Sequence, residues 1–106
     1  MSKARAKGTR GENFFLAHLR ELWPTAERAP LKGVLDHGDF VNVPWLHEAK
    51  HTQKPLFQQW ARVAERKAGR DWCVLWKGDT RRTEGEGPYV MMPLEKYKEL
   101  VKGRCF

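Results

Sequence analysis

The segment GDFVNVPWLHEAK, residues 38–50, carries three ionisable side chains of interest inside an otherwise apolar stretch. Asp39 follows a glycine, and nine residues later Glu48 and Lys50 form an acid-x-lysine triplet. If residues 45–50 are a strand, side-chain alternation puts Glu48 and Lys50 on one face and Ala49 on the other. Packing alone would favour apolar residues here, so the pattern indicates a chemical role.

Two of these side chains are carboxylates that the local fold would bring together. Residues 39–43 and 45–50 have the pattern of two adjacent strands, with a tight turn between them. If the strands pair in an antiparallel hairpin, Asp39 comes close to Glu48 or Lys50. A solvated sheet edge with a cross-strand ion pair would leave the same residues in the sequence, and that alternative stays open.

Converging carboxylates repel each other unless a cation lies between them. Mg²⁺ prefers hard oxygen ligands and keeps several waters. We therefore expect Asp39, Glu48 and the carbonyl of Ala49 to hold Mg²⁺. Lys50 would then stand beside the metal, where it could orient a water nucleophile or offset charge on a phosphate.

Glu12 is a third candidate acid. The apolar spacing of residues 10–24 predicts an amphipathic helix, and Glu12 lies on its apolar face, three residues before Phe15. A carboxylate there is costly without a partner, so Glu12 could assist the metal directly or through water. It could equally complete a capping box with Thr9 as N-cap.

The elements that must position these residues follow from periodicity and from proline and glycine punctuation. Residues 71–78 are a continuous apolar run, as in a buried central strand. In the last helix, Leu94, Tyr97 and Val101 should face inward. The expected fold is α/β, a small mixed five-stranded sheet flanked by helices in the order α-β-β-β-α-β-β-α. Its elements are helix 10–24, strands 26–29, 39–43 and 45–50, helix 55–69, strands 71–78 and 88–92, and helix 93–103.

The charge balance points to a polyanionic partner such as DNA. The 106 residues include 20 Lys and Arg against 13 Asp and Glu, giving a net charge of +7. We expect a flexible basic arm at residues 1–8 and a single domain at residues 9–106. The candidate DNA contacts are Lys3, Arg5, Lys7, Arg10, Lys54, Arg62, Arg66, Arg81 and Arg82. A non-catalytic nucleic-acid-binding module would have the same charge.

The two cysteines, Cys73 and Cys105, have no metal-binding spacing and do not form a disulfide framework. Cys73 lies in an apolar run and should be a buried thiol in a reducing compartment. No stretch has the roughly 20 apolar residues of a membrane span. These features predict a cytoplasmic protein, in the host cytoplasm if it is encoded by a phage.

In order and spacing, the chain resembles the PD-(D/E)xK nuclease superfamily. RGENFF, then GDF, then HEAK, then a helix and a strand are similar to the small archaeal-type and phage Holliday junction resolvases, over residues 9–92. The resemblance makes Glu12 the helix-one glutamate, Asp39 the motif aspartate, Glu48 the motif acid and Lys50 the motif lysine. Gly38 replaces the proline of the motif name, and Asp36 is a rival for the aspartate role.

This resemblance implies a restriction-endonuclease-like fold, Mg²⁺ or Mn²⁺ as cofactor, and cleavage of DNA phosphodiesters. It also implies a homodimer that acts on branched DNA. His51, Gln58 and Gln59 are further candidates for residues near the site. A nuclease of the same fold with another substrate, for duplex nicking or for flap or end processing, is the alternative within the family.

Overall fold

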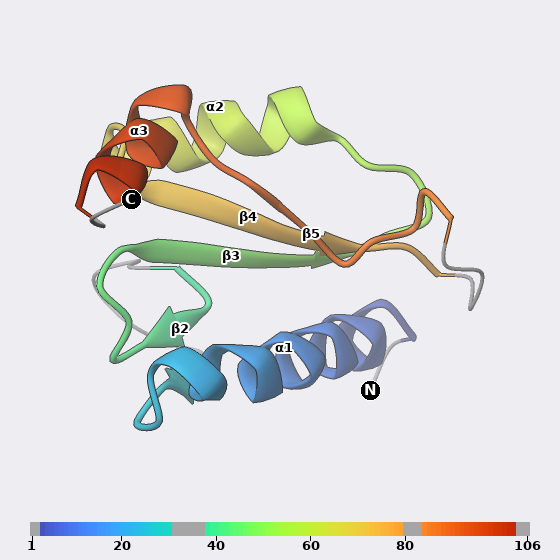
Figure 1. Ribbon diagram of the computed structural model, residues 1–106. Helices are drawn as coiled ribbons and strands as arrows, with labels where there is room; N and C mark the ends of the chain where they lie inside the picture. The colour runs from blue at the N-terminus through green and yellow to red at the C-terminus, as the bar shows by residue number, and fades with distance from the viewer. Residues whose placement is uncertain (1–2, 31–37, 80–83, 104–106) are drawn as a thin grey trace.

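The computed structural model describes residues 3–30, 38–79 and 84–103. These residues form three helices and five strands in the expected order (Figure 1). None of the described helices has the length and apolar character needed to cross a membrane. The elements are α1 (Lys3–Leu22), β1 (Glu27–Arg28), β2 (Phe40–Val41), β3 (Leu46–His51), α2 (Phe57–Ala68), β4 (Trp72–Lys77), β5 (Tyr89–Met91) and α3 (Leu94–Lys102).

The strands form two sheets rather than one. β3, β4 and β5 form a three-stranded sheet in which β4 is central, parallel to β3 and antiparallel to β5. β1 and β2 pair separately, antiparallel, over two residues each. The fold is therefore mixed α/β, and the prediction of a single five-stranded sheet is wrong. β2 ends at Val41 because the chain then turns at Asn42, whose φ is 63°.

The predicted antiparallel hairpin between residues 39–43 and 45–50 is also wrong. Gly38 and His47 form an isolated parallel bridge instead, and the Asp39 amide donates to the His47 carbonyl at 2.9 Å. The bend after β2 redirects the chain, and the Asn42 side-chain amide donates to the Thr25 carbonyl at 2.9 Å. Asp39 consequently reaches β3 along its open edge.

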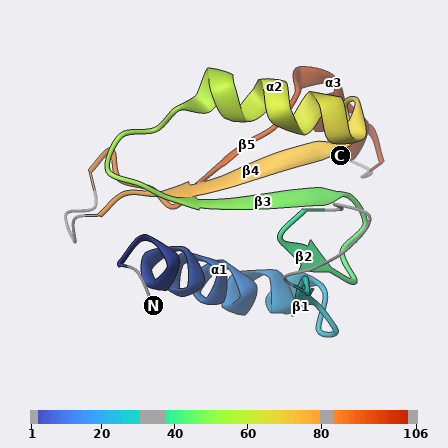
Figure 2. The same cartoon turned by 180° about the vertical axis from the view of Figure 1, so that it is seen from behind.

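The three-stranded sheet lies between α1 on one side and α2 with α3 on the other (Figures 1 and 2). On the α1 side, the core contains Phe15, Leu16 and Leu19 with Phe40, Cys73 and Leu75. On the α2 side, Trp60 and Ala64 pack with Leu46, Trp72, Val74 and Trp76. Since side chains alternate along β3, Glu48 and Lys50 share the α2 side with Leu46.

Helix α1 begins at Lys3, so residues 3–8, expected to be a flexible arm, form its first turns. Alanine, lysine and arginine favour a helix here. The predicted capping box is wrong, because Thr9 and Glu12 lie inside the helix. α1 also passes very close to β3: a Cβ added to Gly11 would lie 2.7 Å from the Cβ of His51.

Helix α3 presents a face that the sequence did not predict. Leu94 and Tyr97, expected to point inward, are 69% and 56% exposed, and Val101 is 36% exposed. Lys96 is buried in their place, with Nζ 3.1 Å from Asp71 Oδ1 and 4.6 Å from the ring centre of Trp45. The ion pair and the aromatic face compensate the buried charge, and they leave an apolar surface open on the other side of α3.

Candidate functional site

Asp39 and Glu48 meet at the open edge of β3, and Glu12 lies near them on α1. The Ala49 amide donates to Asp39 Oδ2 at 2.7 Å and fixes the Asp39 carboxylate against the strand. Glu48 is buried on the α2 side of the same strand. Glu12 reaches this edge from α1, close enough for its charge to act on Asp39. The acids that the sequence singled out are therefore neighbours, although the hairpin expected to join them is absent.

The Asp39 carboxyl shows the electrostatic character of this cluster. Its pKa is raised from 3.8 to about 7, first by burial and then by the charge of Glu48. A side-chain hydrogen bond with Glu48 and the charge of Glu12 raise the pKa further, and the Ala49 amide lowers it without offsetting these effects. Asp39 and Glu48 thus form a carboxyl pair that favours holding a proton or binding another cation.

Lys67, rather than Lys50, is the lysine that contacts Glu48. Its Nζ lies 2.7 Å from Glu48 Oε1. Lys50 projects to the same side of the sheet, and its Nζ lies 5.7 Å from the ring centre of Trp60. Sequence reasoning did not pair Lys67 with Glu48. The available signal was helical spacing, because Lys67 lies seven residues after the buried Trp60 and so returns to the sheet-facing side of α2.

Glu12 also has a basic partner that the sequence did not reveal. Arg28 Nε lies 2.9 Å from Glu12 Oε1, and both side chains are partly buried. Arg28 is held in β1 opposite Phe40 of β2, directly beside Asp39. The β1–β2 ribbon therefore brings a positive charge to the acid cluster.

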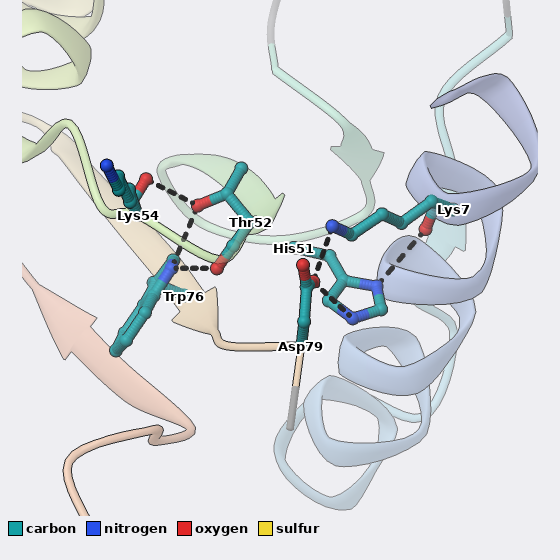
Figure 3. Close-up of polar contacts among 6 residues, drawn as sticks. All are labelled: Lys7, His51, Thr52, Lys54, Trp76 and Asp79. Atoms are coloured by element: carbon teal, nitrogen blue, oxygen red, sulfur yellow. Dashed lines mark hydrogen bonds and ion pairs between the residues drawn. The ribbon is translucent and has the colours of Figure 1, made fainter. Parts of the chain in front are cut away.

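The end of β3 is tied to α1 and to the end of β4 by polar contacts. His51, Lys7 and Asp79 point towards one another (Figure 3). Asp79 Oδ1 lies 2.5 Å from Lys7 Nζ and 3.5 Å from His51 Nε2, and His51 Nδ1 lies 3.3 Å from the Lys7 carbonyl. Burial lowers the pKa of His51. The cluster anchors the strand one residue beyond Lys50, which gives His51 a positioning role.

The candidate metal ligands are the two acids Asp39 and Glu48, rather than a cluster of three or more side chains. Within the described ranges, no three His, Cys, Asp or Glu side chains converge closely enough to hold a metal ion. Mg²⁺ needs only one or two carboxylates when main-chain oxygens and waters complete its shell. Burial, and after it the charge of Glu48, raises the pKa of Asp39, although Lys67 lies beside Glu48. Asp39 and Glu48 with the Ala49 carbonyl are therefore a chemically suitable set, and Glu12 is held apart by Arg28.

Four of the nine predicted DNA contacts lie on the surface of the described part of the chain. The exposed ones are Arg10, Lys54, Arg62 and Arg66. Gln58 and Gln59 are also exposed. Lys7 instead forms an ion pair with Asp79. Lys3 and Arg5 are in α1 by their backbone. Asp36, Arg81 and Arg82 lie outside the described residues.

Cys73 and His47 have structural roles. Cys73 is buried, and burial raises its pKa to about 12, so the thiol is unreactive. His47 packs against Trp23 and Trp45 on the α1 side, opposite Glu48.

Comparison of the chain with protein-family models, with curated proteins and with solved structures found no match.

Proposed function

We propose that this chain is a divalent-metal-dependent endonuclease of the PD-(D/E)xK type that hydrolyses phosphodiester bonds in DNA. The observation that carries the proposal is the Asp39–Glu48 pair at the edge of β3, in which Glu48 is buried, Asp39 is half-buried and the pKa of Asp39 is raised to about 7. The parallel pairing of β3 with β4 through α2 also agrees with the restriction-endonuclease-like arrangement that the resemblance implies.

Each residue then has a role that follows from its place. Asp39, Glu48 and the carbonyl of Ala49 would hold Mg²⁺ or Mn²⁺. When bound, that cation would polarise the phosphodiester and acidify a water. Lys50, on the same side of β3 as Glu48, would offset charge that builds on the phosphate. Glu12 pairs with Arg28 and stays outside this set of ligands.

The substrate that we propose is branched DNA, recognised by shape. The exposed Arg10, Lys54, Arg62 and Arg66 offer contacts to phosphates, which position a duplex without reading its sequence. Branched DNA is the substrate that the resemblance implies. Duplex nicking and flap or end processing are the alternatives within the same fold.

A non-catalytic DNA-binding module is the second candidate, and one observation favours it. Glu48 already has Lys67 as a partner at 2.7 Å, as expected of an acid that only balances charge. In that case the protein would bind DNA in Mg²⁺ without cutting it.

A cleavage assay separates the two candidates. Four-way junction, duplex and single-stranded DNA would be incubated with the wild type, Glu48→Gln and Glu65→Gln in Mg²⁺. Glu65 is an exposed acid on α2 and provides the matched control. We expect cutting by the wild type and by Glu65→Gln only, fastest on the junction. Full activity of Glu48→Gln in excess Mg²⁺ would show that the site is wrong, and binding without cutting by the wild type would favour the module.

A further inference from the structure

Lys67 contacts Glu48, one of the two acids proposed to bind the metal. We propose that Lys67 is a positioning residue that holds the Glu48 carboxylate in the metal-free protein and gives it up when a divalent cation binds. The released ammonium would then serve the phosphate of the DNA strand. This inference rests on the nuclease function proposed above and deepens it.

Glu48 is the buried member of this pair, and Lys67 reaches it from the surface of α2. The Lys67 and Glu48 side chains are 24% and 10% exposed, and Nζ lies 2.7 Å from Oε1. Removing the cation that faces a buried carboxylate is unfavourable. Glu48 also faces Asp39, whose proton affinity it raises. Lys67 therefore supplies positive charge to Glu48, the acid that Asp39 faces.

A divalent cation on Glu48 must compete with this ammonium. A metal ligated by Asp39 and Glu48 brings two positive charges to the carboxylate that Lys67 already contacts, and like charges this close repel in a site of low dielectric. Metal binding should therefore weaken the Lys67–Glu48 contact. The metal replaces the charge that Lys67 supplied, so Glu48 stays compensated throughout the exchange.

A cavity beside Lys67 could receive the displaced ammonium. Lys67 lies in the last turn of α2 and lines a cavity of about 520 Å³ together with residues 40–46, Ala68 and Asp71. This cavity adjoins both the chain that carries Asp39 and the start of β3. The long lysine stem can turn towards the cavity without any change in the helix. A phosphate next to the metal would find a cation there.

A metal titration tests the exchange directly. Mn²⁺ and Ca²⁺ affinities would be measured by calorimetry for the wild type, Lys67→Gln and Lys98→Gln. Lys98 pairs with Glu95 at 3.4 Å on the surface of α3 and is a matched lysine–glutamate control. Because the competing charge is gone, Lys67→Gln should bind metal roughly tenfold more tightly. Unchanged or weaker binding by Lys67→Gln would overturn the proposal, and Lys98→Gln should match the wild type.

A second measurement uses the wild type and does not depend on the folding of a variant. Lysines would be dimethylated briefly with and without Ca²⁺, and the labelling of each would be quantified by mass spectrometry. Labelling of Lys67 should rise with Ca²⁺, because its contact with Glu48 is weakened, while labelling of Lys98 stays constant. Equal or lower labelling of Lys67 in Ca²⁺ would contradict the exchange.

Failure of the nuclease proposal and failure of the Lys67 exchange would give different results. If the wild type binds neither Mn²⁺ nor Ca²⁺, the nuclease proposal fails and this inference fails with it. If Asp39→Asn abolishes metal binding but Lys67→Gln leaves it unchanged, the metal site stands and only the exchange is wrong.

Discussion

At the scale of single residues, Asp39 links the stability of the metal-free protein to pH. Its folded pKa of about 7 lies above the ordinary value of 3.8, so its stabilising contribution is present below pH 3.8 and is lost as pH rises through 7. The difference between the two values corresponds to about 4 kcal/mol. His47 and His51 act in the opposite direction, because their lowered pKa values cost stability as pH falls below 6.5.

Asp39→Asn isolates this effect, because the two histidines are present in both proteins. Without metal, the variant should become more stable than the wild type as pH rises from 5 to 8, by a few kcal/mol. Mg²⁺ at pH 8 should stabilise the wild type and leave the variant unchanged. The measurement is urea unfolding across the pH series. Parallel pH curves for the two proteins would show that Asp39 titrates normally in the fold.

Lys50 should act on the chemical step rather than on DNA binding. Its ammonium lies over Trp60 on the same side of β3 as Glu48, so it should matter most when charge builds on the phosphate. For Lys50→Ala, junction affinity in Ca²⁺ should change by no more than roughly tenfold. The cleavage rate at saturating DNA should fall by orders of magnitude. A parallel loss of affinity and rate would make Lys50 a simple phosphate contact.

The identities of the clustered acids could be predicted from the sequence, but their basic partners could not. Asp39, Glu48 and Glu12 stood out because carboxylates are costly in apolar surroundings. Pairing of Arg28 with Glu12 and of Lys67 with Glu48 depends on how β1 and α2 pack against the sheet. Nothing in the local sequence marks Arg28 as the partner of Glu12, and helical spacing places Lys67 on the sheet-facing side of α2 without identifying Glu48 as its partner.

At the scale of elements, Gly38 determines how Asp39 approaches β3. Its φ is 99°, and an added Cβ would lie 2.7 Å from the His47 carbonyl oxygen. Gly69 also has a positive φ, of 62°, but a Cβ there meets nothing within 4 Å. A methyl group at position 38 would therefore add a backbone clash to the conformational strain that both positions share.

Gly38→Ala should cost more stability than Gly69→Ala for this reason. We expect roughly 1 kcal/mol for Gly69→Ala and more than about 2 kcal/mol for Gly38→Ala. Metal affinity should fall only in Gly38→Ala, because the clash displaces Asp39. Urea unfolding and Mn²⁺ titration would measure both effects. Equal losses in the two variants would mean that the Gly38–His47 bridge does not position the acid.

The order of elements could be predicted, whereas their pairing could not. The helix and strand periodicities gave all eight elements in order, and Gly69 ends α2 as expected. Strands of two residues, such as β1 and β2, carry too little pattern to specify a partner. The sharp turn at Asn42 separates the sheets, and a positive φ at asparagine leaves little signature in a sequence.

At the scale of the whole molecule, the net charge of +7 predicts salt-sensitive DNA binding. Each phosphate neutralised contributes a slope of about −0.9 in log K against log salt. Replacing Lys3 and Arg5 with glutamine preserves helix propensity in α1. If both side chains contact phosphates, the double variant should have a slope shallower by about 1.8. Lys98→Gln with Lys102→Gln on α3 is the control, and equal slopes for all proteins would exclude Lys3 and Arg5 from the DNA interface.

The molecule also carries an apolar surface formed by Tyr89 and Val90 of β5 and Leu94 and Tyr97 of α3. These side chains are 49%, 56%, 69% and 56% exposed, and together with neighbouring residues they line a cavity of about 510 Å³. Contiguous apolar surface of this kind marks interaction sites. Symmetric cutting of two strands of a junction requires two active sites, so a second copy of this chain is the partner that we propose.

Dimerisation through this surface predicts a separation of assembly from folding. Leu94→Glu with Tyr97→Glu puts charge at two exposed positions, so each chain should still fold, whereas a two-fold contact would carry four buried carboxylates. Light scattering should give twice the chain mass for the wild type and the mass of one chain for the variant. The variant should nick the junction, whereas the wild type should cut both strands together. Val63→Glu, exposed to 41% on α2, should remain dimeric. A monomeric wild type at micromolar concentration, with and without junction DNA, would contradict the pairing.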